Sequence, residues 1–122
     1  MVIYSYKDLI VWQKAIKLVV VVYEITEKFP SSELYGLVSQ MRRSSVSIPS
    51  NIAEGRMRGS RKEFAHFLLN AYASGAELET QIEIAKRLPK LNKFDYLVLE
   101  QLLNEIMKML NSIIGKLKAN SQ

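Results

Sequence analysis

Residues 99–117 read LEQLLNEIMKMLNSIIGKL, and this segment shows the clearest helical periodicity in the chain. Its apolar residues recur at steps of three and four, with charged residues such as Glu105 and Lys108 between them. Such spacing places the apolar side chains on one wide face of an α-helix. That face is formed by Leu99, Leu102, Leu103, Ile106, Met109, Leu110, Ile113, Ile114 and Leu117. The segment is therefore predicted to be an amphipathic helix that packs on a hydrophobic core.

Three short segments interrupt the chain before this helix. Pro30 is followed by two serines, so one helix should end and another begin there, because proline disfavours a helical residue before it and serine caps helix starts. Gly59 and Ser60 offer a left-handed stop and an N-cap, and Pro89 marks the third boundary. The predicted helices span residues 5–28, 32–58, 60–88 and 93–118.

Four long helices joined by short turns must lie nearly antiparallel. The composition agrees with a helical protein: at 48% hydrophobic with only 5 Gly and 3 Pro, the chain is too apolar for disorder and too poor in turn residues for a many-stranded β fold. We therefore predict an all-α fold, an antiparallel up-and-down four-helix bundle. It should be a single domain over residues 1–122, with short flexible ends at 1–4 and 119–122.

The first predicted helix is apolar nearly all round. Its core stripe is assigned to Leu9, Trp12, Ile16, Val19 and Tyr23. The valines at 19–22 also favour a strand by propensity, so a short strand is a minor alternative. Because four helices cannot bury both faces of one helix, the surplus apolar residues indicate a subunit interface, although ordinary surface exposure explains them equally well. The predicted interface residues are Ile10, Leu18 and Val21.

The second predicted helix contains a proline. Pro49 has no amide hydrogen and its ring clashes with the carbonyl of Ser45, so a kink is expected near Pro49. Small residues are frequent around it and again in the third helix, at 71 and 73–76. They are interpreted as positions where helix backbones pack tightly.

The sequence offers little for catalysis or metal binding. There is no cysteine and a single histidine, His66, and neither a phosphate-binding loop nor a nucleophile elbow is present. Glu63 and His66 form a Glu-x-x-His pair like those of di-iron bundles, but such sites need the motif twice and two further glutamates. We expect a surface Glu–His pair, no metal, no cofactor and no enzymatic activity.

Membrane insertion and export are not indicated either. The longest apolar run, residues 18–23, is far shorter than the roughly 20 residues that cross a bilayer. Residues 1–4 lack the basic start and the cleavage site of a signal peptide. The lack of cysteine suits a reducing compartment. A cytoplasmic location without membrane contact is expected.

The positive charge is concentrated in one region. The chain has 17 Lys+Arg against 12 Asp+Glu, a net +5, and residues 42–62 hold six basic residues and one acid. Arginine binds phosphate through charge and forked hydrogen bonds, so this region is predicted to bind nucleic-acid phosphates. A solvated basic turn paired with Glu54 and Glu63 is an equally weighted alternative. The candidate nucleic-acid-binding residues are Arg42, Arg43, Arg56, Arg58, Arg61 and Lys62.

A second basic cluster surrounds Pro89. It consists of Lys86, Arg87, Lys90 and Lys93. In an antiparallel bundle the turn between the third and fourth helices lies at the opposite end from the turn between the second and third. The two clusters are therefore expected at opposite poles, unless oligomerisation brings them together.

Four segments, in order along the chain, are similar to a known family. They read YKDLIVWQKA (6–15), FPSSELYGL (29–37), QMRRSSVSIPSNIAEG (40–55) and AELET (76–80). The sequence resembles the bacterial four-helix-bundle proteins known as 23S ribosomal RNA intervening-sequence proteins, to which the accessory variability proteins of diversity-generating retroelements are related. One departure lies at 73–75, where the family more often has a Gly-Ser pair.

The resemblance implies an antiparallel four-helix bundle, a ring-like homopentamer and a basic surface proposed to bind nucleic acid. The matching motifs contain Arg42, Arg43 and Arg56, and the other three candidates rest on charge alone. We therefore expect a non-enzymatic, oligomeric protein that binds RNA or DNA phosphates around 42–62. The alternative is a structural or adaptor bundle that binds a protein partner, with the basic clusters serving solubility or ring assembly.

Overall fold

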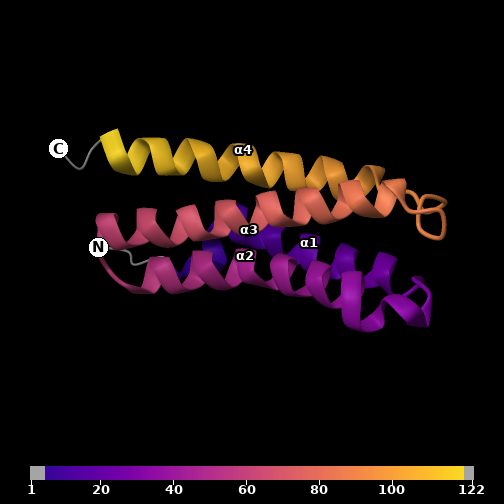
Figure 1. Cartoon of the computed structure of the whole chain (residues 1–122). Helices are drawn as coiled ribbons and strands as arrows, with labels where there is room; N and C mark the ends of the chain where they lie inside the picture. Colours follow the sequence, from indigo (N-terminus) through magenta and orange to yellow (C-terminus); the bar gives the residue numbers. More distant parts are fainter. Residues whose placement is uncertain (1–4, 120–122) are drawn as a thin grey trace.

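The computed structural model describes residues 5–119, which form four long helices and no strand (Figure 1). The helices are α1 (Ile10–Thr26), α2 (Ser39–Met57), α3 (Arg61–Arg87) and α4 (Leu97–Ala119). Two 3-10 turns, η1 (Tyr6–Asp8) and η2 (Ser31–Glu33), and one π-helical turn, η3 (Leu34–Val38), complete the elements. The minor strand alternative at 19–22 is wrong, because these residues lie within α1. Of the predicted flexible ends, residue 119 is the last of α4, and 1–4 and 120–122 lie outside the described residues.

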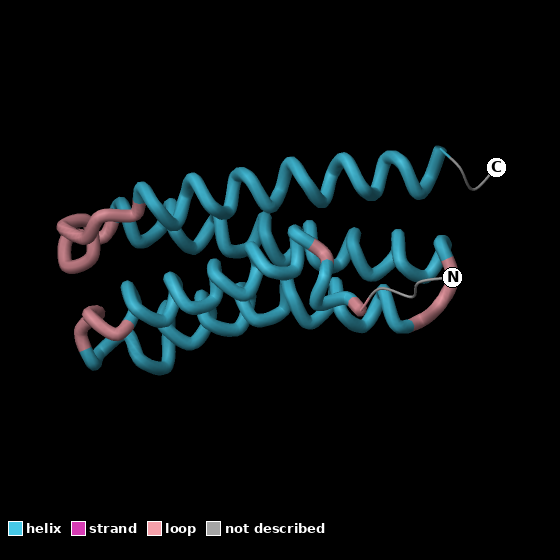
Figure 2. The backbone as a smooth tube through the Cα atoms, turned by 180° about the vertical axis from the view of Figure 1, so that it is seen from behind, coloured by secondary structure: helices cyan, strands magenta, loops and turns pink. Residues whose placement is uncertain are grey.

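The four helices lie side by side and run alternately up and down (Figure 1). α1 packs on α2, α2 on α3, α3 on α4, and α4 on α1, so the helices enclose one core. The α2–α3 turn lies at one end of the bundle, and the other two connections lie at the opposite end, as Figure 2 also shows from behind. The predicted antiparallel four-helix bundle is confirmed.

Local sequence determines the α2–α3 turn. Gly59 has a φ of +85°, a left-handed conformation that glycine adopts without a steric penalty. Ser60 then caps α3, because its Oγ accepts a hydrogen bond from the backbone N–H of Glu63 at 3.1 Å. The predicted left-handed stop and N-cap are both confirmed.

The core on α4 follows the predicted stripe. Its fully buried members include Leu99, Leu103, Ile106 and Leu110. Others pack against the core from its edges, namely Leu102, Met109, Ile113 and Leu117. One amphipathic face therefore determined how this helix packs.

The predicted core stripe of α1 is only partly right: Leu9 and Trp12 pack against the edge of the core, but none of the five predicted residues is buried. The residues buried on α1 are instead Val11, Ala15, Leu18, Val22 and Thr26, whereas Ile16 and Tyr23 are 39% and 41% exposed. Since α1 is apolar nearly all round, hydrophobic periodicity could not fix its inner face. Its polar residues mark the outer face: Gln13, Lys17 and Glu24 lie about opposite the buried residues at 100° per residue.

Polar side chains align α2 with α3. Ser44 Oγ donates to Gln81 Oε1 at 2.6 Å, and the hydroxyl oxygens of Ser47 and Ser74 lie 2.8 Å apart. Ser44, Ser74 and Gln81 are buried, so these hydrogen bonds satisfy groups that would otherwise be costly to remove from water. Most of the predicted close packing positions are buried, but Ser50, Ala73 and Ala76 are exposed, so the prediction is wrong for these three.

α2 contains Pro49 as a buried interior residue, and the chain is helical throughout Ser39–Met57. The departure from helical geometry lies earlier, in η3, where Gly36 has φ −109° and ψ −108°. Near the end of α2, Gly55 allows close packing on α3, because a Cβ at this position would lie 2.5 Å from the Cβ of Phe67.

Candidate nucleic-acid interface

Four of the six candidate basic residues gather at the α2–α3 end of the bundle. We call them the tip cluster: Arg56, Arg58, Arg61 and Lys62. Arg58 Nη2 donates to Glu54 Oε2 at 2.9 Å, and its guanidinium lies 5.0 Å from the ring centroid of Phe67. Arg61 and Lys62 begin α3 and are exposed. The turn between α2 and α3 therefore presents a compact set of cations to solvent.

Arg42 has a different environment. Its Nε donates to Thr26 Oγ1 on α1 at 3.0 Å, and its guanidinium lies 4.4 Å from the ring centroid of Tyr23. Nη2 also lies 4.0 Å from Glu27 Oε2, and the side chain is only 26% exposed. Arg42 thus joins α2 to α1, and much of its hydrogen-bonding capacity is used within the chain.

Arg43 is exposed beside a pocket at the start of α2. We call this the tyrosine pocket; its volume is about 540 Å³. It is lined by Tyr23, Leu34, Tyr35, Val38, Ser39, Arg42, Arg43 and Val46. Sequence reasoning selected the two arginines but missed the two tyrosines. A tyrosine immediately before Gly36, just after a helix boundary, is the signal that could have indicated an exposed aromatic ring.

The basic segment 42–62 is therefore two surfaces and not one. Arg43 lies in the first turns of α2 and Arg56 in its last turn, so about 20 Å of helix separates them at about 1.5 Å per residue. The tip cluster lies at the α2–α3 turn, whereas Arg42 and Arg43 lie toward the other end of the bundle. The expectation of a single basic surface over 42–62 is corrected accordingly.

The second basic cluster lies around the α3–α4 loop, at the opposite end from the tip cluster, as predicted. Two of its members are paired: Lys86 Nζ lies 2.9 Å from Glu100 Oε2, and Arg87 Nε donates to Glu83 Oε2 at 2.9 Å. The hydrogen bond to Glu100 and the charge of its carboxylate raise the pKa of Lys86. These pairs offset much of the positive charge at this end.

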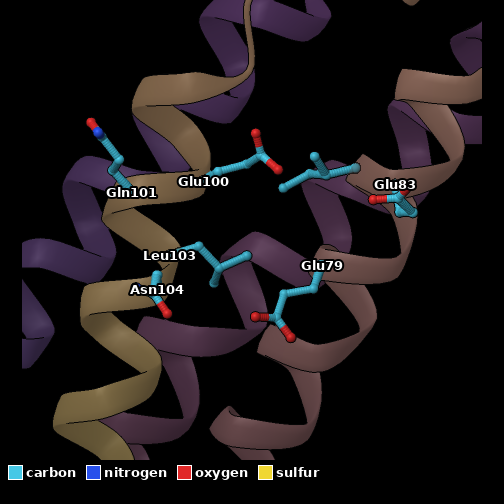
Figure 3. Close-up of a pocket in the computed structure, with 7 residues that line it drawn as sticks. Glu79, Glu83, Glu100, Gln101, Leu103 and Asn104 are labelled. Atoms are coloured by element: carbon cyan, nitrogen blue, oxygen red, sulfur yellow. The ribbon is translucent and has the colours of Figure 1, made fainter.

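A pocket of about 500 Å³ between α3 and α4 is acidic (Figure 3). Glu79 and Glu83 come from α3, and Glu100 extends from α4 toward them. Carboxylates repel phosphate groups, so this side of the bundle is unsuited to a nucleic-acid backbone. The surfaces that suit phosphate are the tip cluster and the α1–α2 side.

The three residues predicted at a subunit interface have different environments. Leu18 is fully buried in the bundle core, so it has no exposed surface with which to contact another subunit. Val21 is half-buried against the core, and Ile10 is 60% exposed. At 100° per residue, Ile10 and Val21 lie on the same flank of α1 as Lys14, which forms an ion pair with Glu105 of α4.

The wider exposed apolar surface lies on the opposite flank of α1, beside α2. We call it the apolar face; on α1 it includes Ile16, 39% exposed, and Val20, 52% exposed. Shallow pockets run along it. Its members are Trp12, Ile16, Val19 and Val20 of α1 and Val46, Pro49 and Ala53 of α2.

Within residues 5–119, no three His, Cys, Asp or Glu side chains are close enough together to hold a metal ion. His66 is exposed and packs edge-on against Phe67, with ring centroids 5.6 Å apart. Over the same residues, no helix has an apolar stretch long enough to span a bilayer.

The family model described as 23S rRNA-intervening sequence protein matches residues 7–112, from η1 into α4. The chain belongs to this family. The resemblance carried by the four motifs is thereby confirmed, and the matched region includes the tip cluster and the tyrosine pocket. The family's name refers to ribosomal RNA and to no enzymatic reaction. No curated protein matches the chain.

Proposed function

We propose that this family member is a non-enzymatic, oligomeric protein of the cytoplasm that binds RNA through phosphate contacts of the tip cluster. The supporting observation is that four basic side chains gather at one turn. Among the described residues, Arg61 and Lys62 form no ion pair, so their charge is available to a ligand. The name of the family favours RNA over DNA.

The local backbone also suits phosphate. Apart from Gly59 and its two neighbours in the chain, no described residue has an atom within 4 Å of the position that a Cβ of Gly59 would occupy, so a ligand could approach the main chain closely there. The next residue, Ser60, caps a helix of 27 residues, whose N-terminus is the positive end of the helix dipole. Phosphate contacts depend on the charge and shape of the RNA backbone and not on the identity of the bases. The affinity should therefore depend steeply on salt concentration and weakly on nucleotide sequence.

Fluorescence anisotropy with a labelled RNA hairpin tests this proposal. Wild-type affinity is expected to fall linearly on a log–log plot against salt concentration. A triple variant with Arg56→Ala, Arg58→Ala and Arg61→Ala should abolish binding, because it removes most of the charge of the tip cluster. Circular dichroism would check that the variant folds. Unchanged binding in this variant would overturn the assignment.

A control variant removes the same charge at the opposite end of the bundle. Lys28, Lys90 and Lys93 are exposed lysines there, and all three can be changed to alanine. This variant has the same net charge as the tip variant, so only the position of the charge differs. It should retain most of the affinity for RNA. Equal losses in both variants would show that overall charge, and not the tip cluster, attracts the RNA.

The apolar face supports the oligomeric part of the proposal. A second copy of the chain would remove exposed Ile16 and Val20 from water, and the family resemblance implies a homopentamer. Sedimentation velocity at micromolar concentration should show an oligomer. Val20→Lys should shift it toward monomer, whereas Val98→Lys, at a similarly exposed apolar position on α4, should not. A wild-type monomer would overturn self-association.

The alternative is an adaptor whose apolar face binds a different protein, with the basic clusters serving solubility or ring assembly. The same exposed apolar side chains support it. It predicts that the wild-type protein shows no salt-dependent affinity for RNA and that Val20→Lys releases a protein partner in a pull-down.

A further inference from the structure

We propose that the tyrosine pocket binds an unpaired base of single-stranded RNA, with Tyr35 as the stacking surface and Arg43 on the adjoining phosphate. This inference rests on the proposed function. It adds a second contact, about 20 Å along α2 from the tip cluster, and it specifies the substrate class as single-stranded RNA.

The first observation is the exposure of Tyr35. Its side chain is 91% exposed and Leu34 is 46% exposed, whereas Leu37 and Val38 of the same π-helical turn are buried. The buried half anchors the turn to the core, so the tyrosine ring is held on an ordered part of the chain. Because the exposed ring contributes little to the core, nearly its whole surface is available to a ligand.

The second observation is the charge of the pocket. Arg42 is fixed against Tyr23, whereas no hydrogen bond or ion pair joins Arg43 to any other described residue. None of the lining residues is acidic. The pocket is therefore lined by two cations, of which Arg42 lies 4.0 Å from Glu27 Oε2 and Arg43 can form a forked hydrogen bond to phosphate.

The third observation is that apolar, aromatic and basic side chains all line the pocket. Leu34 and Val38 provide apolar walls next to the exposed ring and the free guanidinium, and Val46 borders both this pocket and the apolar face. Unpaired bases are bound in this way, by stacking on aromatic rings and by cations along the backbone. Bases inside a duplex are already stacked on their neighbours, so they cannot reach the tyrosine. The pocket should therefore discriminate single strands from duplexes.

A second copy of the chain is a poorer match for this pocket. It would add its own net charge of +5 to a surface that is already positive. Carboxylates of the acidic pocket on a second copy could in principle pair with Arg42 and Arg43. Two of the three already form ion pairs within their own chain, because Glu83 pairs with Arg87 and Glu100 with Lys86. A phosphodiester supplies the missing negative charge directly.

The test uses the full chain and a short oligouridylate RNA in which 2-aminopurine replaces one base. Stacking on Tyr35 should quench the 2-aminopurine fluorescence. Tyr35→Ala should weaken single-strand binding by about fivefold to about a hundredfold, the range for losing one base–aromatic stack, and should abolish the quenching. Tyr35→Phe keeps the ring and should retain both. Arg43→Ala should make the plot of log affinity against log salt concentration less steep, by the amount expected for the loss of about one phosphate contact.

A blunt RNA duplex and one control variant make the result specific. Tyr35→Ala should leave duplex binding unchanged, and Leu97→Ala, which removes another exposed apolar side chain on α4, should leave both affinities unchanged. Equal loss for single strand and duplex, or no loss at all, would overturn the pocket assignment. A lower sedimentation mass for Tyr35→Ala than for wild type would also overturn it, since the ring would then contact a second copy.

Failure of the pocket and failure of the proposed function are distinguishable. If the tip variant loses RNA binding while Tyr35→Ala binds single strands as wild type does, phosphate binding at the tip stands and the pocket assignment is overturned. If wild-type protein binds neither RNA at low salt, both are overturned.

Discussion

Arg42 and Arg43 are adjacent in sequence and carry the same charge, yet they should differ in their effect on stability. Arg42→Ala removes a charged hydrogen bond to Thr26 and a cation–π contact with Tyr23. Such contacts contribute about 1.5–3 kcal/mol and about 0.5–1 kcal/mol respectively, and they are not fully additive. Allowing for the partial exposure of Arg42, we expect the free energy of unfolding to fall by about 2 kcal/mol, or Tm by roughly 6 °C.

Urea denaturation followed by circular dichroism measures this difference, at one protein concentration for every variant because oligomerisation also affects stability. Arg43→Ala is the matched control and should change the free energy of unfolding by less than about 0.5 kcal/mol. A double-mutant cycle with Thr26→Val should show a coupling energy of about 1 kcal/mol. Equal stability of the two arginine variants would refute the role of Arg42 in joining α1 to α2.

Three further predictions concern α2, α4 and the α3–α4 loop. Gly55→Ala should lower the free energy of unfolding by about 1–3 kcal/mol, because its Cβ would lie 2.5 Å from the Cβ of Phe67; urea denaturation measures this. Gly115→Ala has open space around the new Cβ, so the same measurement should show a gain of about 0.5–1 kcal/mol. Burial raises the pKa of Tyr96 from 10.0 to about 12, so the folded state keeps a proton that the unfolded state loses, and stability should fall as pH rises through this range. Tyr96→Phe also loses the hydrogen bond to the Leu91 carbonyl, and its deficit relative to wild type should narrow above pH 10; a constant deficit would contradict this assignment.

The sequence was a good guide where one face of a helix is apolar and the other polar. The stripe of α4 packs as its periodicity indicated, and Gly59 and Ser60 form the expected turn because their local conformations need no distant partner. α1 shows the opposite case. It is apolar nearly all round, so its apolar residues did not indicate the inner face, which only its few polar residues marked, and Leu18, predicted at the interface, is in the core.

The candidate site was harder to predict because charge along the chain does not give position in space. Residues 42–62 form one cluster in the sequence, but α2 extends it over two separate surfaces. Arg42 and Arg43 could not be distinguished without the position of Thr26 on α1. The exposure of Tyr35 depends on the π-helical turn, which simple helical periodicity does not indicate.

The buried hydrogen bonds between α2 and α3 have a further consequence. Sliding α2 along α3 would break the hydrogen bonds of Ser44 with Gln81 and of Ser47 with Ser74, and the buried side chains of Gln81 and Ser74 would lose these partners. The register of the two helices is therefore locked. α2 therefore holds the tip cluster and the tyrosine pocket at a constant separation. An RNA strand would have to exceed a minimum length to occupy both, which makes length, and not sequence, the property that this protein would measure.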